Sequence, residues 1–385
     1  MPDSVPVCPF TIAVHEDVLA DLRDRIRRTR WPDQVTGAGW DYGTDLGYLR
    51  DLLSSWHDFD WLAQQRRLNR ARQFRAVIDG AGVHFVHERG RGPAPFPLLL
   101  THGWPSSFTE YDRLIPLLTD PGSHGADPGD AFDVVVPSLP GYGFSDRPAG
   151  PGLVYPGIAS RWHRLMTEGL GYRRFGAHGT DIGAGVTARL GLDYPRAVAG
   201  VHLSSVGLPE PPEPWSAAER EYVTAIRRWF AAEGGYEHLQ ATRPQTVGYA
   251  LADSPAGLAA WIIEKFRAWS DSRGDVESRF SREQLLTNLT IYWVTGTITS
   301  SMRLYYEYGR YDTPLSPASP VRVPAGFAIF GNEFSPFGQP PRELAERFFP
   351  RITRWAELPR GGHFPAAEEP GLLAAELREF FRPLR

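Results

Sequence analysis

Residues 178–185 read HGTDIGAG, and this segment decides the fold. It joins an apolar stretch typical of a strand to AGVTARLGL (184–192), which is typical of a helix. Glycines two positions before and after Asp181 leave the room that a tight strand-to-helix elbow needs. Because the central side chain is a carboxylate, a covalent step would be its attack on a carbon electrophile. The alternative is that Asp181 only caps the following helix.

Apolar stretches that run into glycine turns recur on both sides of this elbow. Each one leads, directly or after a loop, into a helical stretch. This alternation predicts an α/β fold with a mostly parallel sheet flanked by helices, in which ligands bind at the carboxyl ends of the strands. The stretches are PLLLTHG (97–103), FDVVVPSLPG (132–141), RRFGAHG (173–179), VPAGFAIFGNE (323–333) and ITRWAELPRGGHF (352–364).

Two other regions are predominantly helical. Residues 9 to about 75 predict amphipathic helices, one of them with Thr44 as its N-cap, and no strand of their own. Alternating runs around Asp79-Gly80 then predict a hairpin. The chain is therefore expected to divide into an N-terminal extension (1–90), a first core part (91–206), a helical lid (207–320) and a second core part (321–385).

Composition excludes several classes of function. The chain has 385 residues with 41 Lys+Arg and 45 Asp+Glu, a net charge of −4 that does not favour nucleic acid as a partner. Its single cysteine, Cys8, excludes an intramolecular disulfide framework and a cysteine-ligated metal. No leader-like start and no apolar run of about 18 residues occurs. We expect a soluble, cytoplasmic protein without a membrane partner, cofactor or metal.

A histidine and a carboxylate follow the later predicted strands. His363 comes after paired glycines, and Glu333 ends the strand GFAIF (326–330), so both are expected at the sheet edge that carries Asp181. The order Asp181, Glu333, His363 is that of the α/β-hydrolase triad. Alternatively, Glu333 is an ordinary solvated loop carboxylate and His363 a structural residue. Weaker candidates for the acid, in helix-like segments or at a helix start, are Glu343, Glu346, Glu368 and Glu369.

The turn HGWP (102–105) follows the strand PLLLT. It is placed to present the backbone N–H of Trp104 toward the elbow, where it would form an oxyanion hole with the N–H of Ile182. Such a hole is needed if Asp181 forms an ester, because water then attacks the aspartyl carbonyl and the oxyanion develops on the enzyme. The alternative is a simple tight turn with a core tryptophan.

These motifs and their order resemble an epoxide hydrolase of the α/β-hydrolase superfamily, of the microsomal type with an N-terminal extension. The resemblance covers nearly the whole chain. It implies the α/β-hydrolase fold and hydrolysis of a small hydrophobic epoxide by water to a vicinal diol. It is carried by HGWP, the aspartate elbow, VVVPSLPGYGFSDRP (134–148), RGGHF (360–364), the preface FTIAVHEDVLADLRDRI (10–26) and the lid segment ATRPQTVGYALADSPAGLAAWIIEKFRAWSD (241–271).

The family resemblance also implies two lid tyrosines that bind the epoxide oxygen and supply its proton. Matching GGYEHLQATRP (234–244) and SSMRLYYEY (300–308) to the family pattern puts them at Tyr236 and Tyr305. A shift of one residue in this match would place the second tyrosine at Tyr306 instead of Tyr305. Taken alone, a tyrosine in such an aromatic stretch is more often a packing residue.

The expected mechanism has Asp181 attack an epoxide carbon, after which His363, oriented by Glu333, activates the water that hydrolyses the ester. The sequence departs from the family at Ile182, where tryptophan is common, and at Thr180, in HGTD rather than GGD. These departures leave the substrate's shape open.

Two rival functions remain at this stage. A haloalkane or haloacid dehalogenase also uses an aspartate elbow, but it stabilises the halide with indole N–H donors, one of them beside the nucleophile, which Ile182 does not provide. A non-catalytic ligand-binding protein with the same fold is the other rival. The identity of the epoxide, the stereochemistry and the oligomeric state, with a homodimer as one option, stay open.

Overall fold

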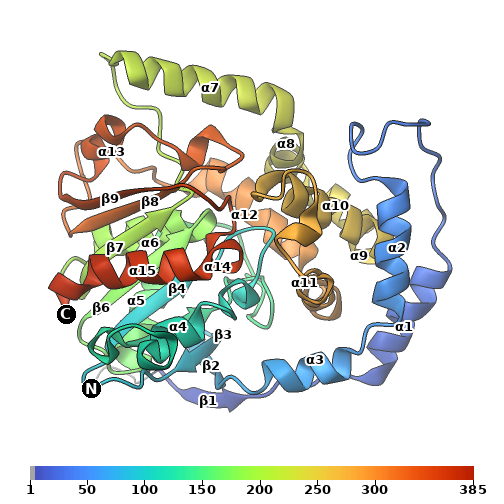
Figure 1. Cartoon of the computed structure of the whole chain (residues 1–385), viewed down its shortest axis with the longest axis horizontal. Coiled ribbons are helices and arrows are strands. Elements are labelled where there is room, and N and C mark those ends of the chain that lie inside the picture. The colour runs from blue at the N-terminus through green and yellow to red at the C-terminus, as the bar shows by residue number, and fades with distance from the viewer. Residues whose placement is uncertain (1–4) are drawn as a thin grey trace.

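The computed structural model describes residues 5–385 and is built around a central sheet (Figure 1). The sheet has nine strands in the order β1-β2-β3-β5-β4-β6-β7-β8-β9. Strands β4 to β9 pair in parallel, whereas β1, β2, β3 and β5 pair antiparallel in succession. The bounds are β1 (Val7–Phe10), β2 (Gln73–Ile78), β3 (Ala81–Glu88), β4 (Phe96–Thr101), β5 (Phe132–Pro137), β6 (Phe175–Thr180), β7 (Val198–Ser204), β8 (Ala325–Phe330) and β9 (Ile352–Leu358).

Helices cover both faces of this sheet. One face packs against α4 (Ile115–Thr119) and α15 (Pro370–Phe381), and the other against α5 (Tyr155–Arg164) and α6 (Ile182–Asp193). Alternate residues of one strand therefore pack on opposite faces. In β4, Leu99 packs in the hydrophobic cluster that contains α5 and α6, and its two neighbours pack in the cluster that contains α4 and α15. Burial on both faces explains why these strands read as continuous apolar runs.

The hairpin predicted at Asp79-Gly80 is confirmed, since β2 and β3 pair antiparallel around that turn. The expectation that the N-terminal region has no strand of its own is wrong. Strand β1 pairs with β2 at the sheet edge. Its four residues are half-buried or exposed, so no alternation of apolar and polar positions reveals it.

Six helices lie in the chain between β7 and β8. Figure 1 shows the last five grouped beyond one end of the sheet, with the first set apart along the top of the view. They are α7 (Ala217–Glu233), α8 (Gly235–Thr242), α9 (Pro244–Asp253), α10 (Pro255–Trp269), α11 (Arg282–Thr295) and α12 (Ile298–Tyr311). The short helices α13 (Arg342–Phe348) and α14 (Pro365–Glu368) follow β8 and β9, respectively.

The N-terminal helices α1 (Glu16–Arg27), α2 (Leu46–His57) and α3 (Trp61–Leu68) pack against α10 and α11. The prediction of Thr44 as the N-cap of α2 is wrong, because Asp45 caps this helix. The Thr44 hydroxyl donates instead to the carbonyl of Ala260 at 2.8 Å. The Trp56 indole donates to Thr290 at 2.8 Å. These bonds attach the N-terminal region to α10 and α11, two of the helices between β7 and β8. Within residues 5–385, no helix combines the length and apolar character needed to cross a membrane.

Candidate active site

Asp181 lies on the elbow between β6 and α6, with backbone angles of φ 54° and ψ −123°. This conformation is strained for a residue with a side chain, and such strain is concentrated at functional sites. The elbow also brings backbones close together, because a Cβ on Gly183 would lie 2.0 Å from the carbonyl oxygen of Thr101. Close packing therefore requires the glycines of this segment, and the elbow that they allow projects the Asp181 side chain from the sheet edge.

The Asp181 carboxylate makes no capping bond to α6, so the capping alternative does not describe this structure. Its Oδ1 accepts the backbone N–H of Trp104 at 2.9 Å. A Cβ on Gly103 would lie 2.3 Å from the same oxygen, so only glycine allows this approach. Burial raises the pKa of Asp181, while the charge of His363 and the N–H groups of Ile182 and Trp104 oppose that rise.

His363 lies between two carboxylates. Its Nδ1–H donates to Glu333 Oε1 at 3.0 Å, and its Nε2 lies 3.7 Å from Asp181 Oδ2. Among the described residues, the buried Nε2 has no hydrogen-bond partner. The other Glu333 oxygen accepts the hydroxyl of Ser205. Nothing in the sequence pattern singled out Ser205, although its place directly after β7 puts it at the carboxyl end of a parallel strand.

The charge of His363 follows from these neighbours. Burial lowers its pKa, but the Coulombic attraction and hydrogen bond of Glu333, with smaller contributions from Asp181 and Glu110, raise the pKa to about 9. With this pKa, His363 is an imidazolium between the two carboxylates at neutral pH. Any loss of charge on Asp181 removes one of the contributions that raise this pKa.

Glu368 holds the loop that carries His363. Its carboxylate accepts the backbone N–H groups on either side of the histidine, from Gly362 at 3.1 Å and Phe364 at 2.9 Å. It also accepts the N–H of Asp271, which follows α10, at 2.7 Å. In sequence it was a weak candidate for the triad acid, whereas the structure makes it a positioning residue for the imidazole.

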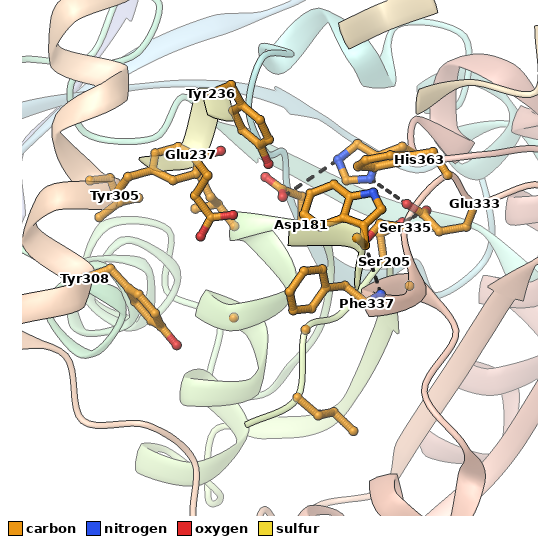
Figure 2. A pocket seen from close by; sticks show the side chains of 18 of the residues that line it. Asp181, Ser205, Tyr236, Glu237, Tyr305, Tyr308, Glu333, Ser335, Phe337 and His363 are labelled. Carbon is orange, nitrogen blue, oxygen red and sulfur yellow. Dashed lines mark hydrogen bonds and ion pairs between the residues drawn. The ribbon is translucent and has the colours of Figure 1, made fainter. Parts of the chain in front are cut away.

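One cavity of about 240 Å³ brings together Asp181, Glu333, His363 and the tyrosines Tyr236 and Tyr305. Figure 2 shows both tyrosine side chains extending from the lid helices toward Asp181. The remaining lining residues are Tyr155, Ile182, Gly185, Ser205, Gly207, Leu208, Pro209, Trp229, Glu237, Leu304, Tyr308, Phe334, Ser335, Phe337 and Gly338.

The two tyrosine rings are held by Trp104. Its fully buried indole stacks on Tyr236 with ring centroids 5.5 Å apart and meets Tyr305 edge-on at 6.0 Å. Trp104 thus supports the cavity from behind these rings, in addition to its N–H bond to Asp181. Tyr306 instead packs against the Arg310 guanidinium. The helical register of α12 therefore directs Tyr305, and not Tyr306, into the cavity.

The hydroxyls of Tyr236 and Tyr305 lie among buried side chains and close to the negative charge of Asp181. Burial raises the pKa of each well above its ordinary value, and the nearby charge of Asp181 contributes to the same shift. Both side chains therefore remain protonated hydrogen-bond donors at neutral pH. The site offers a carboxylate, a histidine–carboxylate pair and two phenol donors around one space.

Comparison with known families agrees with this geometry. A family model described as "Epoxide hydrolase N terminus" matches residues 7–111. A second model, described as "alpha/beta hydrolase fold", matches residues 97–233. The first covers the N-terminal helices and the strands up to β4, and the second covers the elbow.

Relatives match over almost the full chain. A Stigmatella aurantiaca protein that bears the provisional name of an epoxide hydrolase is 43% identical over 98% of this chain and 86% of its own length. Epoxide hydrolase 1 of the rabbit Oryctolagus cuniculus is 37% identical, covering 97% and 88%. The crystal structure of juvenile hormone epoxide hydrolase from the silkworm Bombyx mori superposes with a TM-score of 0.87 at 30% identity, covering 99% and 95%. With this fold, this site and these relatives, the chain belongs to the epoxide hydrolase family of the α/β hydrolases.

Proposed function

We propose that the protein hydrolyses an epoxide with a hydrophobic body to a vicinal diol through a covalent ester on Asp181. The observation that carries this proposal is the convergence of residues from separate segments on one cavity. The elbow supplies the nucleophile, the loops after β8 and β9 supply Glu333 and His363, and helices α8 and α12 supply Tyr236 and Tyr305. A packing role alone would not require a carboxylate and an imidazole to face the same space as two phenols.

In the first step Asp181 Oδ2 attacks an epoxide carbon and the bond from that carbon to the ring oxygen breaks. Oδ2 is the available oxygen, because Oδ1 is held by the Trp104 N–H. The developing alkoxide takes a proton from Tyr236 or Tyr305, which avoids expelling a strongly basic alkoxide. The His363 imidazolium restores the proton to the tyrosine, so the step ends with a neutral hydroxyalkyl ester and a neutral imidazole.

The second step uses this change in charge. Esterification of Asp181 removes a carboxylate that raises the pKa of His363, so the imidazole becomes a base after the ester has formed. Nε2 takes a proton from water, and the hydroxide adds to the Asp181 carbonyl carbon. The N–H groups of Trp104 and Ile182 stabilise the resulting oxyanion. Its collapse breaks the bond to the diol oxygen, which takes the remaining proton of the added hydroxide. The diol leaves, and the carboxylate and the imidazolium are as they were before the first step, so protons balance over the cycle.

The function itself is tested by product analysis on matched substrates. We expect the purified protein to convert styrene-like, aliphatic or polycyclic epoxides to diols and to release no halide from the corresponding chloroalkanes. The reason is that the cavity presents phenol donors suited to an oxygen leaving group. Diol is measured by chiral chromatography and halide by ion chromatography. Halide release without diol would contradict the proposal in favour of a dehalogenase, and saturable binding without turnover would favour a receptor.

A further inference from the structure

Glu237 lines the same cavity, and the mechanism proposed above does not use it. It follows Tyr236 in the first turn of α8, and Figure 2 shows its carboxylate pointing into the space near Asp181, Tyr305 and Tyr308. Within residues 5–385 the Glu237 carboxylate forms no hydrogen bond or ion pair with another side chain. Glu237 is partly exposed, so water reaches its carboxylate, but no positively charged side chain of the described residues pairs with it.

The surroundings of Glu237 are aromatic and negative. Its charge contributes to raising the pKa of Tyr155, Tyr305 and Tyr308, which places all three rings within its electrostatic reach. Burial, followed by the charge of Asp181, raises the pKa of Glu237 itself to about 7. Among the described residues that line the cavity there is no lysine or arginine, and His363 is already paired with Glu333.

A positively charged group on the substrate would give the Glu237 carboxylate the partner that the protein does not supply. It would pair with the Glu237 carboxylate in a partly desolvated site, where such attraction is stronger than in bulk water. The faces of the neighbouring tyrosine rings would add cation–π attraction. The site already provides Asp181 and the phenol donors for the reacting oxirane, so the cation would occupy a separate end of the molecule.

We infer that Glu237 is a specificity-determining residue that selects epoxides carrying a cationic amine remote from the oxirane. This inference rests on the proposed function and narrows its substrate class to a hydrophobic body with a charged end. The competing explanation is that water entering the cavity solvates Glu237, in which case the residue has no influence on the choice of substrate.

The test uses pairs of terminal epoxides of increasing methylene spacer length. One member of each pair ends in a trimethylammonium group and the other in a tert-butyl group, so the two have the same shape and differ by one charge. We expect wild type to show a higher kcat/KM for the charged member at a favoured spacer length. Glu237→Gln should lower the charged-to-neutral ratio of kcat/KM about tenfold, which corresponds to the loss of one moderately desolvated ion pair.

Two further variants isolate the effect. Glu221→Gln removes the same charge from the exposed side of α7, outside the cavity, and should keep the wild-type ratio. Glu237→Asp retains the charge on a shorter side chain and should move the preference to a longer spacer. Thermal unfolding of each variant, followed by circular dichroism, separates a change in specificity from a loss of fold.

An equal effect of Glu237→Gln on both members of every pair would overturn the inference, as would a wild type with no preference for the charged member at any spacer length. In either case, diol formed from the neutral epoxides would leave the proposed function standing. If neither member of any pair is converted to diol, the proposed function fails and the inference fails with it.

Discussion

Replacement of His363 by glutamine should slow turnover strongly and leave substrate attached to Asp181. Glutamine cannot act as the base that activates water, whereas the attacking carboxylate and both phenol donors remain in place. We expect the steady-state rate to fall roughly 10²- to 10⁴-fold, the usual contribution of a general base. Intact-protein mass spectrometry should show a gain equal to the mass of the epoxide, and peptide mapping should locate it on Asp181.

The incubation should be carried out over a range of alkaline pH, because removing the His363 cation raises the pKa of Asp181 further and the nucleophile must be ionised. The matched control is the double variant His363→Gln with Asp181→Ala, which should gain no mass. An inactive His363→Gln protein that never acquires substrate mass, while wild type forms diol, would contradict the covalent route.

Removal of both lid hydroxyls, as Tyr236→Phe with Tyr305→Phe, should slow the first step and not the second. Without a phenol donor the ring oxygen must leave as a free alkoxide, so we expect a loss of roughly 10²- to 10⁴-fold in kcat/KM. In contrast to the histidine variant, no ester should accumulate, because its formation is then the slow step. Rapid-quench mass spectrometry of a single turnover measures both quantities.

The chain offers a matched control for this prediction at Tyr306, which packs on Arg310 outside the cavity. Tyr306→Phe should keep wild-type activity, while Tyr305→Phe alone should lose part of it. A larger loss from Tyr306→Phe than from Tyr305→Phe would show that the second proton donor has been assigned to the wrong residue of α12.

The fold and the position of Asp181 on the elbow could be predicted because their signals are local. Glycines around Asp181 and an apolar run before it are sufficient to identify an elbow, and the structure shows the backbone contacts that exclude larger residues there. His363 and Glu333 were predictable for a related reason. Each follows a strand, and parallel strands bring their carboxyl ends to one edge of the sheet.

Other features depend on contacts between distant segments, and no local pattern contains them. Ser205 matters because folding brings it to Glu333, and Glu368 because it spans the N–H groups beside His363. Strand β1 is short and lies at an edge, and the N-cap of α2 shifted because Thr44 bonds to α10. No sequence motif distinguishes Glu237 from other charged residues in helical segments. The domain boundaries, the cytoplasmic location and the oligomeric state stay predictions.

The ester on Asp181 is the central claim, and one isotope experiment tests it most directly. Wild-type protein in excess over an epoxide is allowed a single turnover in H₂¹⁸O, and the protein and the diol are then analysed separately by mass spectrometry. If water attacks the aspartyl carbonyl, the heavy oxygen enters the Asp181 carboxylate and the diol from that first turnover carries none. Label found in the diol, with an unlabelled Asp181 peptide, would mean that water attacks the epoxide directly and would contradict the account.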